Sequence, residues 1–187
     1  MTLILGGDHS IGSGSIVGHF TNFPNSFVVW VDAHADINTP QSSASRHTHG
    51  MPISFVLTET NLFHKHTALR ISNQCMFELL YIGLRDFDSP ERPNSQVNLS
   101  FRIDSLDPKY ASCTGTPVPG GLSLEEGKYI CKVLAQTGHL RSMVLAEVNT
   151  SLGSPKEAKT TVNSAVELIK SALLLDWTRI RCRLIEA

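Results

Sequence analysis

Three side chains of the kinds that bind metals follow one short apolar run near the start of the chain. Residues 27–31 are apolar, and Asp32, His34 and Asp36 come next at alternate positions. A short β-branched run is typical of a buried strand, along which alternate side chains point the same way. Buried carboxylates need a counter-charge, which a divalent cation supplies. Oxygen and imidazole ligands favour manganese, zinc or iron over metals that prefer thiolates. The alternative to a metal site is a strand end whose carboxylates are solvated.

Acids and imidazoles also follow four further apolar runs. They are His9 after residues 2–5, Asp86 and Asp88 after residues 79–84, Asp104 and Asp107 after residues 97–103, and Glu147 after residues 143–146. Ligands of parallel α/β sheets bind at the edge where the carboxyl ends of the strands meet. The convergence of five such ends therefore predicts one polar site, and it is a stronger signal than any single motif.

The elements that must position these side chains alternate between strands and helices. Helices are expected over residues 11–20, 52–61, 124–136 and 156–175, and strands over the five apolar runs. Ser123 and Glu126 form a capping box for the third helix, and Ser10 or Ser13 is expected to cap the first. Alternating strands and helices predict an α/β fold of three layers, with a mostly parallel sheet flanked by helices.

Composition indicates an ordinary globular protein. The chain has 187 residues, 41% hydrophobic and 18% charged, which predicts a single domain over residues 1–187 with its own core. A net charge of −1 favours neither nucleic acid nor a membrane surface as a partner. No apolar run is long enough to span a bilayer. The four cysteines form no C-x-x-C pair, which favours reduced thiols.

Three motifs resemble the signatures of the ureohydrolases. They are Gly6-Gly7-Asp8-His9-Ser10, Asp32-Ala33-His34-Ala35-Asp36 and Ser100-Phe101-x-x-Asp104-x-x-Asp107-Pro108. Residues 36–40, 49–50, 83–88 and 147–149 narrow the resemblance to arginase, rather than agmatinase or formiminoglutamase. The similarity extends from Leu3 to about Leu173. It implies a hydrolase that converts L-arginine to L-ornithine and urea.

The resemblance implies a centre of two manganese ions. His9, Asp32 and Asp36 match the ligands of one ion. Asp32, His34 and Asp104 match the ligands of the other, so that Asp32 would bridge the two. By this resemblance, two such ions would lower the pKa of a shared water and so supply the hydroxide that attacks the guanidinium carbon.

The resemblance also assigns residues to the substrate. Glu147 matches the acid that binds the guanidinium group, and His49 matches the proton shuttle to the leaving amine. Without the matched motif, each would be interpreted as an ordinary polar residue of a strand end or a loop. The positions that match contacts to the rest of the substrate are Asn38, Ser45, Asp88, Glu91 and Thr116.

One position departs from the family pattern. The third signature is Ser-Phe-Asp-x-Asp, and here Arg102 replaces the first aspartate, which bridges both metals. The formal charge of the site would be about +2, counting two divalent cations, the three remaining aspartates and this guanidinium. At ~4 Å and an effective dielectric of 20, the guanidinium repels each unit of metal charge by ~4 kcal/mol. We therefore expect Arg102 to take the metals' space and to pair with Asp32, Asp36 or Asp104, leaving one bound manganese ion or none. Activity is then reduced; the alternative is a catalytically inactive arginase-like binding or regulatory protein.

Two further departures concern chain length. The chain starts inside a strand, and the connection at residues 92–96 is too short for a parallel crossover. We expect N-terminal strands and a segment near 92–96 to be missing relative to the family, or the flanking strands to pair differently. The family forms trimers, so the resemblance keeps a homo-oligomer as an alternative. The C-terminal tail that contributes to the trimer interface is expected to be missing. A cytoplasmic location is expected, with the mitochondrion as the alternative.

Overall fold

The sheet of this protein is entirely parallel. The computed structural model describes residues 1–56, 78–82 and 95–175. In the described residues five strands form one sheet in the order β1–β5–β4–β2–β3. The strands are β1 (Thr2–Leu5), β2 (Ser26–Val31), β3 (Glu78–Ile82), β4 (Gln96–Arg102) and β5 (Leu140–Ala146). All neighbouring strands pair in parallel, so every carboxyl end lies at the same edge.

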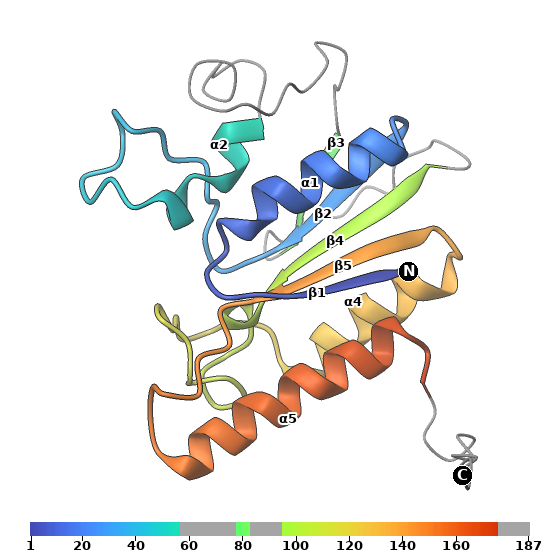
Figure 1. Cartoon of the computed structure of the whole chain (residues 1–187). Coiled ribbons are helices and arrows are strands. Elements are labelled where there is room, and N and C mark those ends of the chain that lie inside the picture. Colours follow the sequence, from blue (N-terminus) through green and yellow to red (C-terminus); the bar gives the residue numbers. More distant parts are fainter. Residues whose placement is uncertain (57–77, 83–94, 176–187) are drawn as a thin grey trace, which may run out of the picture.

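Helices cover both faces of the sheet, as Figure 1 shows. Helices α1 (Ile11–Asn22) and α2 (Pro52–Val56) lie on one face, and α4 (Leu124–Gln136) and α5 (Pro155–Ala172) lie on the other. Short 3-10 turns, η1 (Thr48–Gly50) and η3 (Ile103–Ser105), lie near the carboxyl edge. The expected three-layer α/β architecture is confirmed. None of the helices described is both long and apolar enough to cross a lipid bilayer.

Alternation along β2 divides the core between the two faces. Val28 and Trp30 pack with the apolar residues of α1 and α2. Val29 and Val31 pack with those of α4 and α5. Both sides of the strand are fully buried, as expected for a parallel strand between two helical layers.

The two long C-terminal helices begin as their sequences predict. Ser123 and Glu126 form the expected capping box at α4, and an equivalent pair begins α5. The expectation for α1 is wrong, because Ser10 has helical φ and ψ angles and its side chain makes no cap bond. Side-chain capping needs an extended N-cap conformation. Ser13 instead donates its hydroxyl proton to the carbonyl of Pro52, which joins α1 to α2.

The strands on either side of the short connection do not pair with each other. β3 and β4 both pair with β2, one on each side. This arrangement agrees with either alternative from the sequence, so the missing segment near 92–96 stays a prediction. The expected missing segment falls largely on residues 83–94, outside the described part of the chain.

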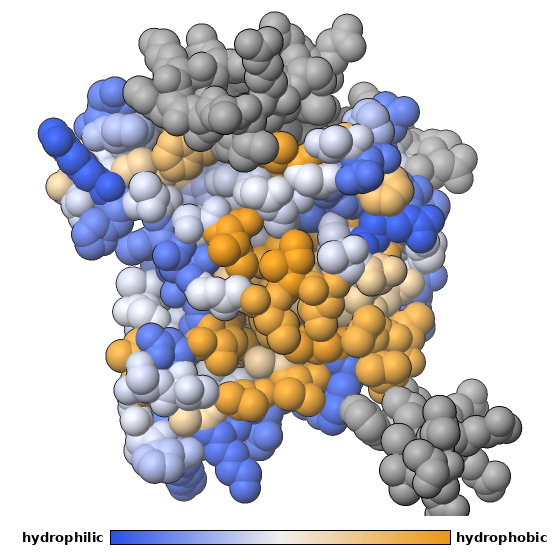
Figure 2. Space-filling model, viewed as in Figure 1, coloured by the Kyte–Doolittle hydropathy of each residue, from blue (hydrophilic) through white to orange (hydrophobic). Residues whose placement is uncertain are grey.

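Strand β1 forms one edge of the sheet and pairs only with β5 among the described strands. Its side chains remain partly or fully open to solvent, and Leu5 is 65% exposed. Figure 2 shows apolar surface gathered over the middle of the view, where Figure 1 places α1, β1 and β5. This edge is thus more apolar than the rest of the visible face.

A glycine in α1 allows the close approach of Trp30. A Cβ atom at Gly12 would lie 2.6 Å from Trp30 Cη2, whereas a Cβ at Gly18 of the same helix meets nothing within 4 Å. Alanine stabilises a helix interior over glycine by about 1 kcal/mol, but overpacking a core costs about 1–3 kcal/mol. We therefore expect Gly12→Ala to lower the melting temperature and the control Gly18→Ala to raise it, as measured by calorimetry. A rise with both variants would contradict this packing.

Candidate functional site

The side chains predicted from the strand ends do converge. Two groups of potential metal ligands have their ligand atoms within 4.8 Å of one another: His9 with Asp32 and Asp36, and Asp32 with His34 and Asp104. Asp32 belongs to both groups. These are the two ligand sets that the family resemblance implies, and all but the half-buried His34 are buried.

Local backbone geometry positions the residues that follow β2. The backbone N–H of His34 donates to Asp32 Oδ1 at 2.8 Å. Asp36 has a φ of 52°, a left-handed conformation that few residues other than glycine adopt. Its carbonyl accepts the backbone N–H of Ile53 at 3.2 Å. The chain therefore turns sharply at Asp36 toward α2 and leaves the carboxylate facing the site.

His9 is held on three sides. Its ring stacks on Trp30, with ring centroids 4.0 Å apart. Nδ1 lies 2.8 Å from Asp32 Oδ2, and Nε2 lies 2.8 Å from Ser100 Oγ. Trp30 Nε1 also donates to Asp32 Oδ2 at 3.2 Å. The sequence analysis missed Trp30 and Ser100, although each lies two residues before a site position on the same side of a strand.

The guanidinium of Arg102 lies inside the carboxylate cluster. Nη1 is 3.4 Å from Asp32 Oδ1 and 3.6 Å from Asp36 Oδ1, and Nε is 3.2 Å from Asp104 Oδ2. Nη2 is 3.5 Å from Glu147 Oε1. The side chain is 3% exposed. The expectation that Arg102 pairs with the aspartates is confirmed, and Glu147 is a fourth, unexpected partner.

Burial and neighbouring charges shift the protonation of the cluster. Burial raises the pKa of Asp36 and raises that of Asp104 to about 6. Burial acts in the same direction on Asp32, but hydrogen bonds from His34 and His9 lower its pKa. Burial alone would lower the pKa of Arg102, yet the surrounding carboxylates hold it above its usual value. The guanidinium thus stays charged beside an Asp32 carboxylate that is ionised near pH 7.

A metal centre is the chemistry that this donor set suits, since carboxylates and imidazoles bind borderline and hard divalent cations. Arg102 interferes with it. Nη1 lies 3.0 Å from His34 Nδ1 and 3.4 Å from Asp32 Oδ1, so it occupies the space beside two atoms that a cation would use. The residues therefore do not fit a pair of cations while Arg102 holds this position.

Glu147 and Thr116 join the cluster as the resemblance implies. Glu147 Oε1 accepts the backbone N–H of His9 at 3.0 Å, and its own φ is 67°. Thr116 Oγ1 accepts from Arg102 Nη2 at 3.2 Å and donates to Asp104 Oδ2 at 3.1 Å. Both side chains therefore face the guanidinium.

The remaining predicted residues make contacts within their own loop or lie outside the described chain. Asn38 Oδ1 accepts from Ser42 Oγ, and Ser45 lies beside Ser43, so these contacts stay within the loop. The ring of His49 lies 5.3 Å from that of His47, centroid to centroid. Asp88 and Glu91 are outside the described residues. Their substrate roles stay predictions.

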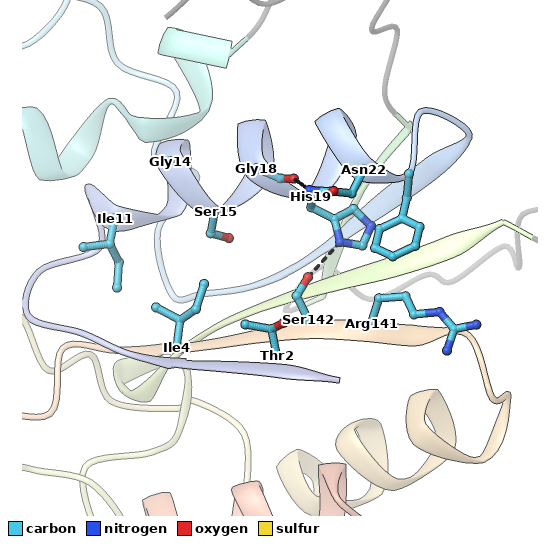
Figure 3. A pocket seen from close by; sticks show the side chains of 11 residues that line it. Thr2, Ile4, Ile11, Gly14, Ser15, Gly18, His19, Asn22, Arg141 and Ser142 are labelled. Atoms are coloured by element: carbon cyan, nitrogen blue, oxygen red, sulfur yellow. Dashed lines mark hydrogen bonds between the residues drawn. The ribbon is translucent and has the colours of Figure 1, made fainter.

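A separate cavity of about 410 Å³ lies between α1 and the β1–β5 edge (Figure 3). The side chain of His19 points toward Ser142, with Nδ1 2.8 Å from Oγ. Ser142 Oγ also accepts from the amide of Asn98 at 2.8 Å. Burial lowers the pKa of His19 to about 4, so the ring is neutral near pH 7. None of the predicted site residues lines this cavity, which is distinct from the carboxylate cluster.

Known proteins share both the sequence and the fold. Arginase-1 of Oryctolagus cuniculus is 38% identical, over 90% of this chain and 64% of that protein. The human protein Arginase-2, mitochondrial, is 39% identical, over 90% of this chain and 58% of that protein. The chain thus spans less than two thirds of the length of these relatives.

Solved structures agree with this similarity. Arginase from Bacillus subtilis superposes with a TM-score of 0.73 at 30% identity, covering 93% of this chain and 72% of that one. Entamoeba histolytica arginase, solved in complex with L-ornithine, also gives 0.73, at 28% identity, covering 92% of this chain and 69% of that one. The model of the Arginase family matches residues 1–98 and 91–175. This chain belongs to the arginase family.

Proposed function

We propose that this chain is an arginase-type hydrolase that converts L-arginine to L-ornithine and urea, with its activity reduced by Arg102. The observation that carries the proposal is the assembly of both implied ligand groups around Asp32, with ligand atoms within 4.8 Å of one another. Manganese is the proposed cation. The similarity to arginases over 90% of the chain supports the choice of substrate.

The chain's own residues account for the recognition of a guanidinium group. Glu147 presents a carboxylate that already lies 3.5 Å from a guanidinium nitrogen, Nη2 of Arg102. Thr116 adds a hydroxyl beside the same nitrogen. In the proposed reaction, L-arginine places its guanidinium against Glu147, and His49 delivers a proton to the leaving amine. Asn38, Ser45, Asp88 and Glu91 are the proposed contacts to its α-carboxylate and α-amino groups.

Arg102 explains why the proposed activity is reduced. Its guanidinium is buried and lies against the carboxylates of Asp32, Asp36, Asp104 and Glu147. Removing one partner from a buried ion pair costs about 3–5 kcal/mol. Substrate and cations must therefore displace a side chain that the cluster already holds.

The same contacts favour a second candidate, a catalytically inactive arginase-like binding or regulatory protein. In that case Arg102 keeps the cluster folded without turnover, and the chain acts through an assembly with its own copies or with intact arginase subunits. The observation in its favour is that one buried guanidinium contacts carboxylates of both ligand groups.

Urea release from L-arginine, after incubation with manganese, separates the two candidates. We expect slow release that exceeds the background of a Glu147→Gln variant, because this variant keeps the size of the side chain but loses the anionic acceptor. Release no faster than that background would reject the hydrolase and leave the inactive protein. A calorimetric titration should also find fewer than two tight manganese sites; two stoichiometric sites would contradict the role given to Arg102.

A further inference from the structure

Both terminal nitrogens of the Arg102 guanidinium have hydrogen-bond partners in the cluster, and Nε lies close to Asp104 without a hydrogen bond. Nη1 faces Asp32, Asp36 and His34, Nε faces Asp104, and Nη2 faces Thr116 and Glu147. These partners follow strands β2, β4 and β5, so they surround the planar group from several elements. A planar guanidinium presents its donors in a fixed fork, which such a set of acceptors matches.

We propose that the carboxylate cluster is a binding site for a planar guanidinium cation and that the chain's own Arg102 fills it. The side chain replaces the metal charge on the aspartates and also takes a position against Glu147. This inference goes beyond the proposed hydrolysis, because it holds whether or not the chain turns over L-arginine. It also implies that the fold around the cluster does not depend on a bound metal.

The tethered Arg102 side chain leaves hydrogen-bonding groups of the site unused, its own Nε among them. Asp104 Oδ1 and Asp36 Oδ2 are buried and accept no hydrogen bond. Asp104 is 0% exposed and Asp36 is 5% exposed. Arginine has five N–H donors, and its chain fixes the orientation of the group. A free guanidinium ion has an additional donor and no tether, so it can also reach these oxygens.

Shortening Arg102 tests the proposal directly. We expect Arg102→Ala to melt below the wild-type protein in EDTA, and millimolar guanidinium chloride to raise its melting temperature by about 5 °C relative to sodium chloride at equal ionic strength. The wild-type protein should show no such rise, because its site is filled. Ammonium chloride should have no effect, since a tetrahedral cation does not match the planar acceptor set.

Arg141→Ala is the matched control. This variant also removes a guanidinium, but from the surface, where Arg141 bonds to Gln96, and guanidinium chloride should not raise its melting temperature. An equal response of a folded Arg102→Ala and of the control would overturn the proposal. If Arg102→Ala does not remain folded, its refolding yield is compared in the same two salts, and equal yields would overturn the proposal.

Metal addition to the wild-type protein provides a second measurement. Neither EDTA nor micromolar manganese should move its melting temperature. A clear rise with manganese would show that the metal displaces Arg102 and would overturn the proposal. Neither measurement uses urea release. Failure of the guanidinium site and failure of the hydrolase are therefore distinguishable.

Discussion

An Arg102→Asp variant is expected to bind two manganese ions and to release urea much faster than the wild-type protein. The substitution removes a buried cation that contacts both ligand groups and adds the carboxylate that the family signature has at this position. A repulsion of ~4 kcal/mol per unit charge corresponds to about a thousandfold in affinity. Calorimetric manganese titration measures the stoichiometry, and a urea assay measures the rate.

An Arg102→Asn variant is the control for this prediction. It removes the guanidinium but adds no charge, so manganese binding should fall between that of the wild-type protein and that of Arg102→Asp. A folded Arg102→Asp that binds no more manganese than the wild-type protein would show that Arg102 does not limit metal binding. The cause would then lie elsewhere in the chain.

An Asp32→Asn variant is expected to lose about 3–5 kcal/mol of unfolding free energy, since it removes a buried anion that contacts both Arg102 and His9. The carboxylate accepts from Trp30 Nε1 and from the backbone N–H of His34, and it lies against the His9 ring and the Arg102 guanidinium. An amide of the same size offers one acceptor oxygen. For a chain of this length, the loss corresponds to a fall of roughly 10 °C in melting temperature.

Glu125→Gln serves as the control for Asp32→Asn. Glu125 lies on the exposed surface of α4, where its contact is Lys128 at 2.8 Å. Exposed pairs of this kind contribute little to stability, so the midpoint of thermal unfolding should not move. If Asp32→Asn also left the midpoint unchanged, the prediction would be wrong. Repulsion among the buried carboxylates would then cancel the stabilisation that Asp32 gains from its hydrogen bonds and ion pairs.

The strands and the two ligand groups could be predicted from the sequence because their signals are local. Alternation after residue 31 places Asp32, His34 and Asp36 together, and parallel strands bring their carboxyl ends to one edge. The charge count at Arg102 likewise needed no structure. The contact between Arg102 and Glu147 could not be predicted, because it depends on the pairing of β4 with β5.

Other features depend on competition between local contacts. Ser10 has the residue type of a cap, but its backbone is helical and its own N–H donates to Asp8. In the loop that follows Asp36, short side chains such as Asn38 and Ser42 bond to one another. Such residues offer several local hydrogen bonds of similar energy. Sequence alone therefore does not select among them.

The order of strands in the sheet has a consequence for synthesis. Among the described strands β1 is made before its one partner, β5, and Thr2 of β1 lies beside Ser142 of β5. At about 5–20 residues per second, the first strand waits on the order of ten seconds for this partner. His9 cannot donate its backbone N–H to Glu147 before then. The centre is therefore completed only after β5 has been synthesised, and a nascent chain that ends before β5 lacks the pairing partner of β1.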